Sequence, residues 1–284
     1  MKKALALLSV SMLLQPALVF AEQTNTDKTC SKTCHHKHHC KHHSCSTCGS
    51  CKKDVVVTKD KAPTEPVKKD TKYAWMDNLT GNFDFTSNYI FRGESQSANL
   101  PAAQGGLTYT FPIGLYLNAW GSNVKFPGTN ATLELDAIIG WHGTTFKDAL
   151  TYDINLDRYN YPGAHRLNYN ELNTLFNYKF LQLGVSYSAN AYGSHQTGIY
   201  YNGGINYDIP PQYIFNIQDL NLTALLGHYS LPRAAGNSYN DYQVNLTKKF
   251  RTYALMVQWV STNGRQHNSP YDGSQIVGTL TANF

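Results

Sequence analysis

The sequence predicts an all-β fold: an antiparallel transmembrane β-barrel of about twelve strands, preceded by a disordered Cys/His-rich arm. Three observations support this prediction. Apolar residues recur at every second position from Leu79 to the end of the chain, the pattern of strands with two unlike faces. Short turns alternate with long polar loops between the expected strands. All six Cys and six of the 11 His lie between residues 30 and 51, outside that pattern.

Residues 1–21 are predicted to be a signal peptide. Lys2 and Lys3 precede an apolar stretch from Ala4 to Phe20, and the small residue Ala21 precedes the expected cleavage point. The apolar stretch is short for a membrane-spanning helix, which argues against an uncleaved anchor. The protein is therefore expected to be exported.

Residues 22–53 are predicted to be a disordered arm that chelates a transition metal, Zn or Cu. Apart from Cys it has almost no core-forming residues, so it cannot bury enough apolar surface to offset chain entropy. Thiolates and imidazoles are ligands for both metals. Disulfide formation during export, or an arm without function, are the alternatives. The candidate ligands are Cys30, Cys34, His35, His36, His38, His39, Cys40, His42, His43, Cys45, Cys48 and Cys51.

Residues 54–77 carry Lys, Thr, Pro63 and Pro66 without a helical stripe, and are predicted to be a linker. The net charge of +5 divides unevenly, with +6 up to Asp77 and −1 over residues 78–284. Because the basic charge belongs to the arm and its linker, it does not indicate a nucleic-acid partner.

Residues 78–284 are predicted to form the barrel. In its first strand, Gly81, Phe83, Phe85, Ser87, Tyr89 and Phe91 share one face. The twelve expected strands cover residues 81–91, 107–111, 115–119, 133–141, 150–156, 172–178, 181–189, 199–209, 220–229, 242–250, 253–261 and 276–284.

The face opposite the apolar one is rich in Asn, Thr, Gln and charged residues, which fits a water-filled lumen. A soluble sandwich or lipocalin-like barrel is the alternative, but it would turn its apolar face inward. Of the 20 Tyr, 19 follow residue 77, and they are expected to form aromatic girdles near the strand ends. The candidate lumen-lining residues are Asp84, Arg92, Glu134, Asp136 and Glu171.

The connections alternate in length. Short turns are expected at residues 112–114, 179–180 and 251–252, and those after the fourth and eighth strands are intermediate. Short turns on one rim, long loops on the other and an even strand number are typical of outer-membrane barrels, whose turns and termini lie in the periplasm. The longer loops are expected at residues 93–102, 124–130, 162–169, 190–197, 230–239 and 262–275.

Several runs resemble the Gcw_chp family, also called TorF-family porins, of proteobacteria. They are FDFTSNYIFRGESQSANLPAAQGGLTY, LYLNAWGSNVKF, LELDAIIGWHG, YDINLDRYNYPG and NELNTLFNY, in that order. The resemblance runs from about Asn78 to Phe284 and leaves out the arm and the linker. It implies a Gram-negative outer-membrane barrel and no settled activity. The region 208–221 around Pro210-Pro211 departs from the family pattern.

The sequence predicts two alternative functions for the barrel. The first is an outer-membrane channel for small hydrophilic solutes or ions, since twelve strands enclose a narrower lumen than those of general porins. The second is a non-conducting barrel that anchors a periplasmic metal-buffering arm. A barrel-rim enzyme is the third and weakest alternative, because G-x-S-x-G, H-E-x-x-H and phosphate-binding Gly motifs are absent. The expected partners are outer-membrane lipid, small solutes or ions, and transition metal ions. The barrel itself is expected to need no cofactor.

Overall fold

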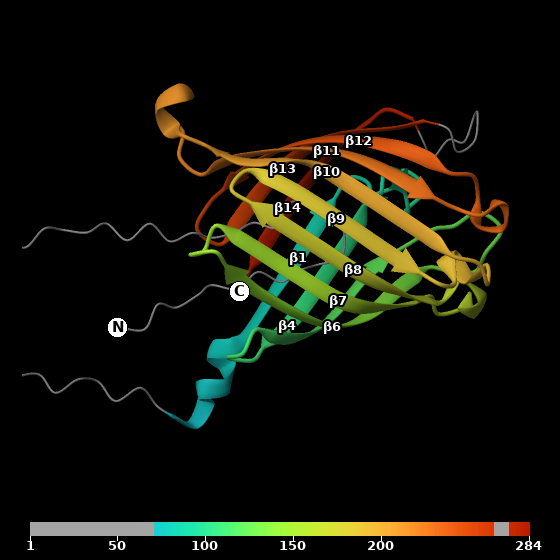
Figure 1. Ribbon diagram of the computed structural model, residues 1–284. Helices are drawn as coiled ribbons and strands as arrows, with labels where there is room; N and C mark the ends of the chain where they lie inside the picture. Colours follow the sequence, from blue (N-terminus) through green and yellow to red (C-terminus); the bar gives the residue numbers. More distant parts are fainter. Residues whose placement is uncertain (1–70, 264–272) are drawn as a thin grey trace, which may run out of the picture. The chain divides into compact units, whose positions relative to one another are not determined.

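The computed structural model describes residues 71–263 and 273–284, and in this part of the chain twelve antiparallel strands close into a barrel (Figure 1). The predicted twelve-stranded barrel is confirmed. The strands are β1 (Leu79–Thr86), β4 (Ala102–Thr110), β5 (Leu115–Asn123), β6 (Leu133–Thr145), β7 (Leu150–Asn160), β8 (Tyr169–Tyr178), β9 (Leu181–Ser188), β10 (Gly198–Ile209), β11 (Leu220–Ser230), β12 (Tyr239–Lys249), β13 (Tyr253–Asn263) and β14 (Gln275–Asn283).

Each strand pairs with its neighbour in sequence, and β1 closes the ring by pairing with both β4 and β14. The last residue, Phe284, completes this seam. Its amide donates to the Gly81 carbonyl at 3.0 Å, and the Gly81 amide donates to the Phe284 carbonyl at 2.9 Å. A Cβ at Gly81 would lie 2.5 Å from the Phe284 ring, so the absence of a side chain at position 81 lets the aromatic terminus cover the seam.

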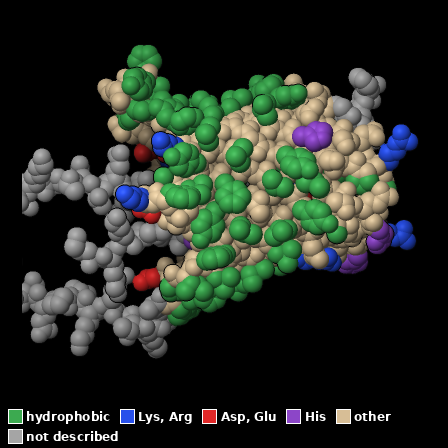
Figure 2. All heavy atoms as spheres, in the orientation of Figure 1, with side chains coloured by type: hydrophobic (Ala, Val, Ile, Leu, Met, Phe, Trp, Pro, Cys, Tyr) green, Lys and Arg blue, Asp and Glu red, His purple; other side chains and the backbone are tan. Residues whose placement is uncertain are grey.

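The alternation of the sequence becomes an apolar outer wall and a polar interior, called here the lumen. In β1, Phe83 and Phe85 are 53% and 56% exposed, whereas Asp84 between them is 7% exposed. Figure 2 shows apolar side chains spread over the visible wall, while Lys and Arg lie toward both of its ends and Asp and Glu mainly toward one. This polarity is the reverse of that of a soluble barrel, which fills its interior with apolar side chains.

The two rims differ as the sequence predicts. One rim carries the start of β1, the end of β14 and the connections 111–114, 146–149, 179–180, 210–219 and 250–252. We call it the turn end. The other rim, the loop end, carries the connections 87–101, 124–132, 161–168, 189–197, 231–238 and 264–274, of which 264–272 lie outside the described residues. The first barrel strand therefore begins, and the last one ends, at the turn end (Figure 1).

The helical elements are short 3₁₀ turns: η1 (Thr71–Asn78), η2 (His165–Leu167), η3 (Ala191–Gly193), η4 (Pro211–Tyr213) and η5 (Arg233–Ala235). In the described residues no helix has the length and apolar content to cross a membrane. The sequence did not predict η1, which occupies the last part of the expected linker. Its residues from Trp75 to Asp77 are exposed, so no apolar stripe marks this helix in the sequence.

One prediction about the first strand is wrong. It was expected to continue to Phe91 with Tyr89 and Phe91 on the outer face, but β1 ends at Thr86. The chain then forms a separate hairpin of β2 (Ile90–Phe91) and β3 (Glu94–Ser95). Tyr89 and Phe91 are 1% and 5% exposed, because this hairpin folds into the lumen instead of extending the wall.

The expectation of tyrosine girdles also needs correction. Eight of the 20 tyrosines are buried in the interior: Tyr89, Tyr116, Tyr159, Tyr161, Tyr169, Tyr200, Tyr229 and Tyr239. Their rings fill space in the interior, and the hydroxyls of Tyr116, Tyr159, Tyr161 and Tyr200 donate to lumen carboxylates, so they act as packing residues rather than interface anchors. The predicted signal peptide, the Cys/His arm and the linker up to residue 70 lie outside the described residues.

Candidate functional site

The candidate site lies in the lumen near the loop end, where the β2–β3 hairpin meets the barrel wall. Asn88 fixes the base of the hairpin. Its Oδ1 accepts hydrogen bonds from the hydroxyls of Ser95 and Ser97 at 2.6 and 3.0 Å. The Ser97 hydroxyl also accepts from the Tyr89 amide at 3.0 Å. These bonds satisfy polar groups that would otherwise be buried without partners, which explains why the chain leaves β1 at this point.

The tip of the hairpin is the two-residue turn Arg92-Gly93. Their φ angles are +48° and +85°, and two successive positive φ values are the signature of a type I′ hairpin turn. Only glycine fits the second position, because a Cβ at Gly93 would collide with the Thr262 methyl of β13 and would lie 2.7 Å from the Asp241 Cβ of β12. The tip is therefore in direct contact with the wall.

Arg92 reaches the wall on the far side of the lumen. Its Nη1 donates to Glu171 Oε2 at 2.9 Å and its Nη2 to Glu171 Oε1 at 2.6 Å, a bidentate pair. The two side chains are 3% and 0% exposed. Glu171 lies on β8, whereas β1, from which the hairpin starts, pairs with β4 and β14. The hairpin thus bridges the lumen.

Aromatic rings enclose the guanidinium. The Arg92 Cζ lies 4.5 Å from the ring centroid of Tyr200 on β10, 4.7 Å from that of Tyr229 on β11 and 4.5 Å from that of Phe91 in the hairpin. Cation–π contacts of this kind strengthen when water is excluded. The hairpin tip is accordingly held by one ion pair and three aromatic faces.

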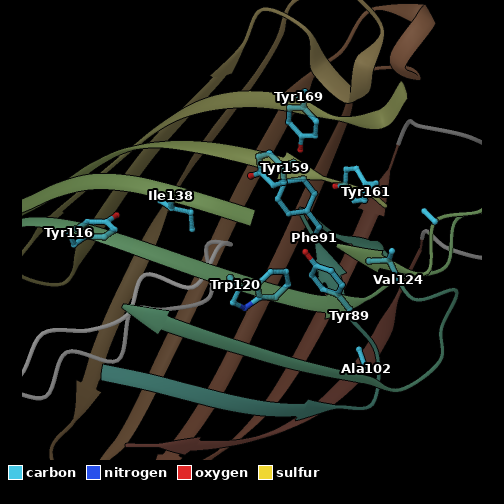
Figure 3. Close-up of a cluster of buried hydrophobic side chains, with 11 residues drawn as sticks. Tyr89, Phe91, Ala102, Tyr116, Trp120, Val124, Ile138, Tyr159, Tyr161 and Tyr169 are labelled. Atoms are coloured by element: carbon cyan, nitrogen blue, oxygen red, sulfur yellow. The ribbon is translucent and has the colours of Figure 1, made fainter. Parts of the chain in front are cut away.

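The other side of the hairpin packs on a second aromatic group. Tyr89 meets Trp120 of β5 edge to face at 5.6 Å, and Phe91 meets Tyr159 of β7 at 6.1 Å. Figure 3 shows Phe91 directed toward Tyr159, with Tyr89 beside Trp120. The runs TSNYIFRGESQS and WGSNV, which carry the family resemblance, are therefore packed together: the first forms the hairpin and the second supplies its support.

Negative charge is concentrated near the hairpin. Glu134 and Asp136 on β6, Asp157 on β7 and Glu171 on β8 are each 4% exposed or less. Asp157 lies directly across from Glu171 in the β7–β8 register. Tyr161 donates to Glu134 Oε1 at 2.8 Å, but both carboxylate oxygens of Asp157 lack hydrogen-bond partners. The guanidinium of Arg92 offsets one of these charges.

The phenol of Tyr161 remains a donor in this setting. Tyr161 follows β7 at the loop end, and burial together with the charges of Glu134 raises its pKa well above the usual range. A neutral phenol can donate to a carboxylate, whereas a phenolate cannot. The raised pKa therefore extends to higher pH the range over which this phenol donates to Glu134.

Toward the turn end the lumen wall is mostly uncharged. Amide and hydroxyl side chains dominate it, and some of them pair, such as Asn118 Nδ2, which donates to Thr108 Oγ1 at 2.7 Å. Such groups both donate and accept, which suits contact with water or with hydroxylated solutes. The lumen therefore has a polar neutral part and a charged, aromatic part.

All five predicted lumen residues lie in the interior, with Asp84 at 7%, Arg92 at 4%, Glu134 at 2%, Asp136 at 4% and Glu171 at 1% exposure. The structure joins Arg92 to Glu171 and brings Glu134 and Asp136 near them, while Asp84 pairs with Asn82 at 2.6 Å. The partners Tyr159, Tyr200, Tyr229 and Asp241 were not among the predicted lumen residues. Their positions in the strands could have revealed them. Each lies an even number of residues from the polar lumen residues of its own strand and so points to the same side.

A sequence comparison assigns the barrel region to a family described as bacterial protein of unknown function (Gcw_chp), which matches residues 74–283. The chain belongs to the Gcw_chp family. The matched region contains the whole barrel and the β2–β3 hairpin and leaves out the predicted arm. A search of curated proteins finds no match to this member.

Solved structures similar to this Gcw_chp protein include porins and another outer-membrane protein. The KdgM porin has 10% identity and a TM-score of 0.45 over 72% of this chain and 99% of its own. The NanC porin has 10% identity and a TM-score of 0.45 over 72% and 98%. The outer-membrane protein opdK from Pseudomonas aeruginosa has 14% identity and a TM-score of 0.38 over 73% and 67%. Identities this low carry no residue roles across to this chain.

Proposed function

We propose that this protein is an outer-membrane channel for small hydrophilic solutes or ions, narrowed at its loop end by the β2–β3 hairpin. The observation that carries the proposal is the closed barrel with an apolar wall and a polar lumen. Water cannot cover so large an apolar surface favourably, whereas lipid can. Closing the sheet also leaves no unpaired strand edge inside a bilayer.

Most of the buried ionisable side chains of the lumen are carboxyl groups. Seven acidic residues are buried in it, namely Asp84, Glu134, Asp136, Asp153, Asp157, Glu171 and Asp241, against the basic residues Arg92 and Lys249. Fixed negative charge lowers the energy of a passing cation and raises that of an anion. A channel through this barrel is therefore expected to conduct K⁺ in preference to Cl⁻.

Refolded protein in planar bilayers tests this proposal. We expect discrete conductance steps, and in a KCl gradient a reversal potential on the cation-selective side. Unheated protein should also migrate differently from boiled protein on a gel, as intact membrane barrels do. A barrel that shows the gel shift without conductance steps would exclude the channel and leave an anchoring role, and a missing gel shift would exclude the membrane barrel.

We also propose that residues 22–53 chelate Zn or Cu in the periplasm. The support is the sequence alone, with six Cys and six His within residues 30–51. Placing the start of β1 at the turn end is consistent with an arm on the periplasmic side. Full-length protein and a variant lacking residues 30–51 should differ in Zn(II) uptake but show the same heat-dependent gel shift. Equal uptake by both would refute chelation by the arm.

A further inference from the structure

The groups around the Arg92 guanidinium form a pocket that belongs mainly to the barrel wall. Glu171, Tyr200 and Tyr229 lie on β8, β10 and β11, and only Phe91 comes from the hairpin itself. The combination of a bidentate carboxylate with two aromatic faces recognises a planar cation by charge, shape and hydrogen bonding. These wall groups lie on strands of the closed barrel and not on the hairpin.

The carboxylate is held by a wall residue as well as by Arg92. The Tyr159 hydroxyl donates to Glu171 Oε1 at 3.1 Å, and the Tyr159 ring stacks on Tyr169 with centroids 4.2 Å apart and an interplanar angle of 9°. These two tyrosines lie on β7 and β8. Glu171 is therefore oriented by the wall, independently of its ion pair.

One aromatic face is oriented in the same way. The Tyr200 hydroxyl donates to Asp241 Oδ2 at 3.1 Å, and Gln243 Nε2 donates to the same oxygen at 2.7 Å. Gly227 on the intervening strand leaves space for this contact, because a Cβ there would collide with Tyr200 and Asp241. The pocket is preorganised, which lowers the cost of binding a ligand.

The pocket also contains a second carboxyl group, with which Arg92 does not pair. Asp157 lies across from Glu171 in the register, is 1% exposed and has no hydrogen-bond partner on either carboxylate oxygen. Side chains that lie directly opposite each other on paired strands are roughly 5 Å apart at Cβ. A ligand with a second positive charge would therefore find a carboxylate beside the first.

We propose that this pocket binds organic cations that carry a guanidinium group, and that Arg92 is its tethered occupant. A ligand entering from the loop end would displace the hairpin tip and take the place of Arg92 on Glu171. Because a tethered group acts at an effective concentration of about millimolar or above, free ligand competes in the wild-type protein only at higher concentrations. The hairpin then excludes other solutes until such a cation is present.

The test uses full-length refolded protein in detergent and measures binding by calorimetry, so it does not depend on conduction. R92A leaves the pocket empty, and methylguanidinium and agmatine are the probes. We expect both to bind R92A about ten- to a hundredfold more tightly than wild type, the range expected for charge-assisted hydrogen bonds. Agmatine, with its second charge, should bind more tightly than methylguanidinium. R92K, which keeps a tethered cation, should bind both probes weakly.

Two controls decide the interpretation. Methylurea has a similar planar shape without the charge and should not bind R92A. The double variant R92A/E171Q removes the carboxylate charge and should lose the gain in affinity. Equal binding by R92A and R92A/E171Q, or equal affinity for methylurea and methylguanidinium, would overturn the proposal. Should R92A fail to show the heat-dependent gel shift of a folded barrel, R92Q takes its place in the same measurements. A folded, non-conducting protein that binds agmatine would refute the channel and retain this site.

Discussion

Replacing Gly93 by Ala should displace the hairpin tip from the wall and widen the channel. The alanine side chain would destabilise the docked hairpin in two ways. A φ of +85° costs an L-residue about 1–2 kcal/mol. Its Cβ would also collide with the Thr262 methyl and would lie 2.7 Å from the Asp241 Cβ, and overpacking of this kind costs about 1–3 kcal/mol. The sum of about 2–5 kcal/mol corresponds to roughly a thirtyfold or greater loss of preference for the docked hairpin.

Gly128 provides a matched control. Its φ of +73° gives G128A a similar backbone strain, but a Cβ there meets nothing within 4 Å. In planar bilayers G93A should show larger conductance steps, or more time in an open state, than wild type, and G128A should match wild type. Both should keep the heat-dependent gel shift. Equal conductance of G93A and G128A would refute the reasoning, because then contact of the tip with the wall does not restrict the lumen.

Three further predictions concern the lumen and the arm. D136N/D157N should lower the K⁺/Cl⁻ permeability ratio measured from reversal potentials, by up to about fivefold per carboxylate; an unchanged ratio would place these groups outside the ion path. Y159F removes the donor to Glu171 and should lower the free energy of unfolding in urea by about 1–2 kcal/mol. Y169F should leave the free energy of unfolding nearly unchanged because the Tyr169 hydroxyl has no hydrogen-bond partner. An equal decrease in the two variants would contradict this role for Tyr159. Metal bound through imidazoles in the arm should be released as the pH falls below about 6.5. Equal Zn(II) affinities at pH 7.5 and 5.5 would exclude His ligation.

The strand pattern was predictable because side chains of a strand alternate between two faces, and the two faces of this wall meet different surroundings. In the first strand, the apolar Phe83 and Phe85 and the charged Asp84 between them already indicated which face pointed outward. The same parity placed Glu134, Asp136 and Glu171 in the lumen. The alternation predicts the side to which a residue points only where a strand is uninterrupted. It therefore held along the twelve barrel strands.

The hairpin was not predictable in this way. Tyr89 and Phe91 continue the parity of Phe83 and Phe85, so the local pattern favours an uninterrupted strand. The interruption depends on Asn88 bonding to Ser95 and Ser97 and on Arg92 pairing with Glu171, 79 positions along the chain. A sequence separation of that size has no local signature.

The sequence by itself determined the barrel, its strand number, its two unlike rims and the polar character of its lumen, because these follow from local periodicity and from connection length. Only the tertiary structure decided that the first long loop turns inward, that Arg92 is enclosed by Glu171, Tyr200 and Tyr229, and that many tyrosines fill the interior. Those features arise from contacts between strands on opposite sides of a closed sheet, and which strands face each other is set by closure of the ring.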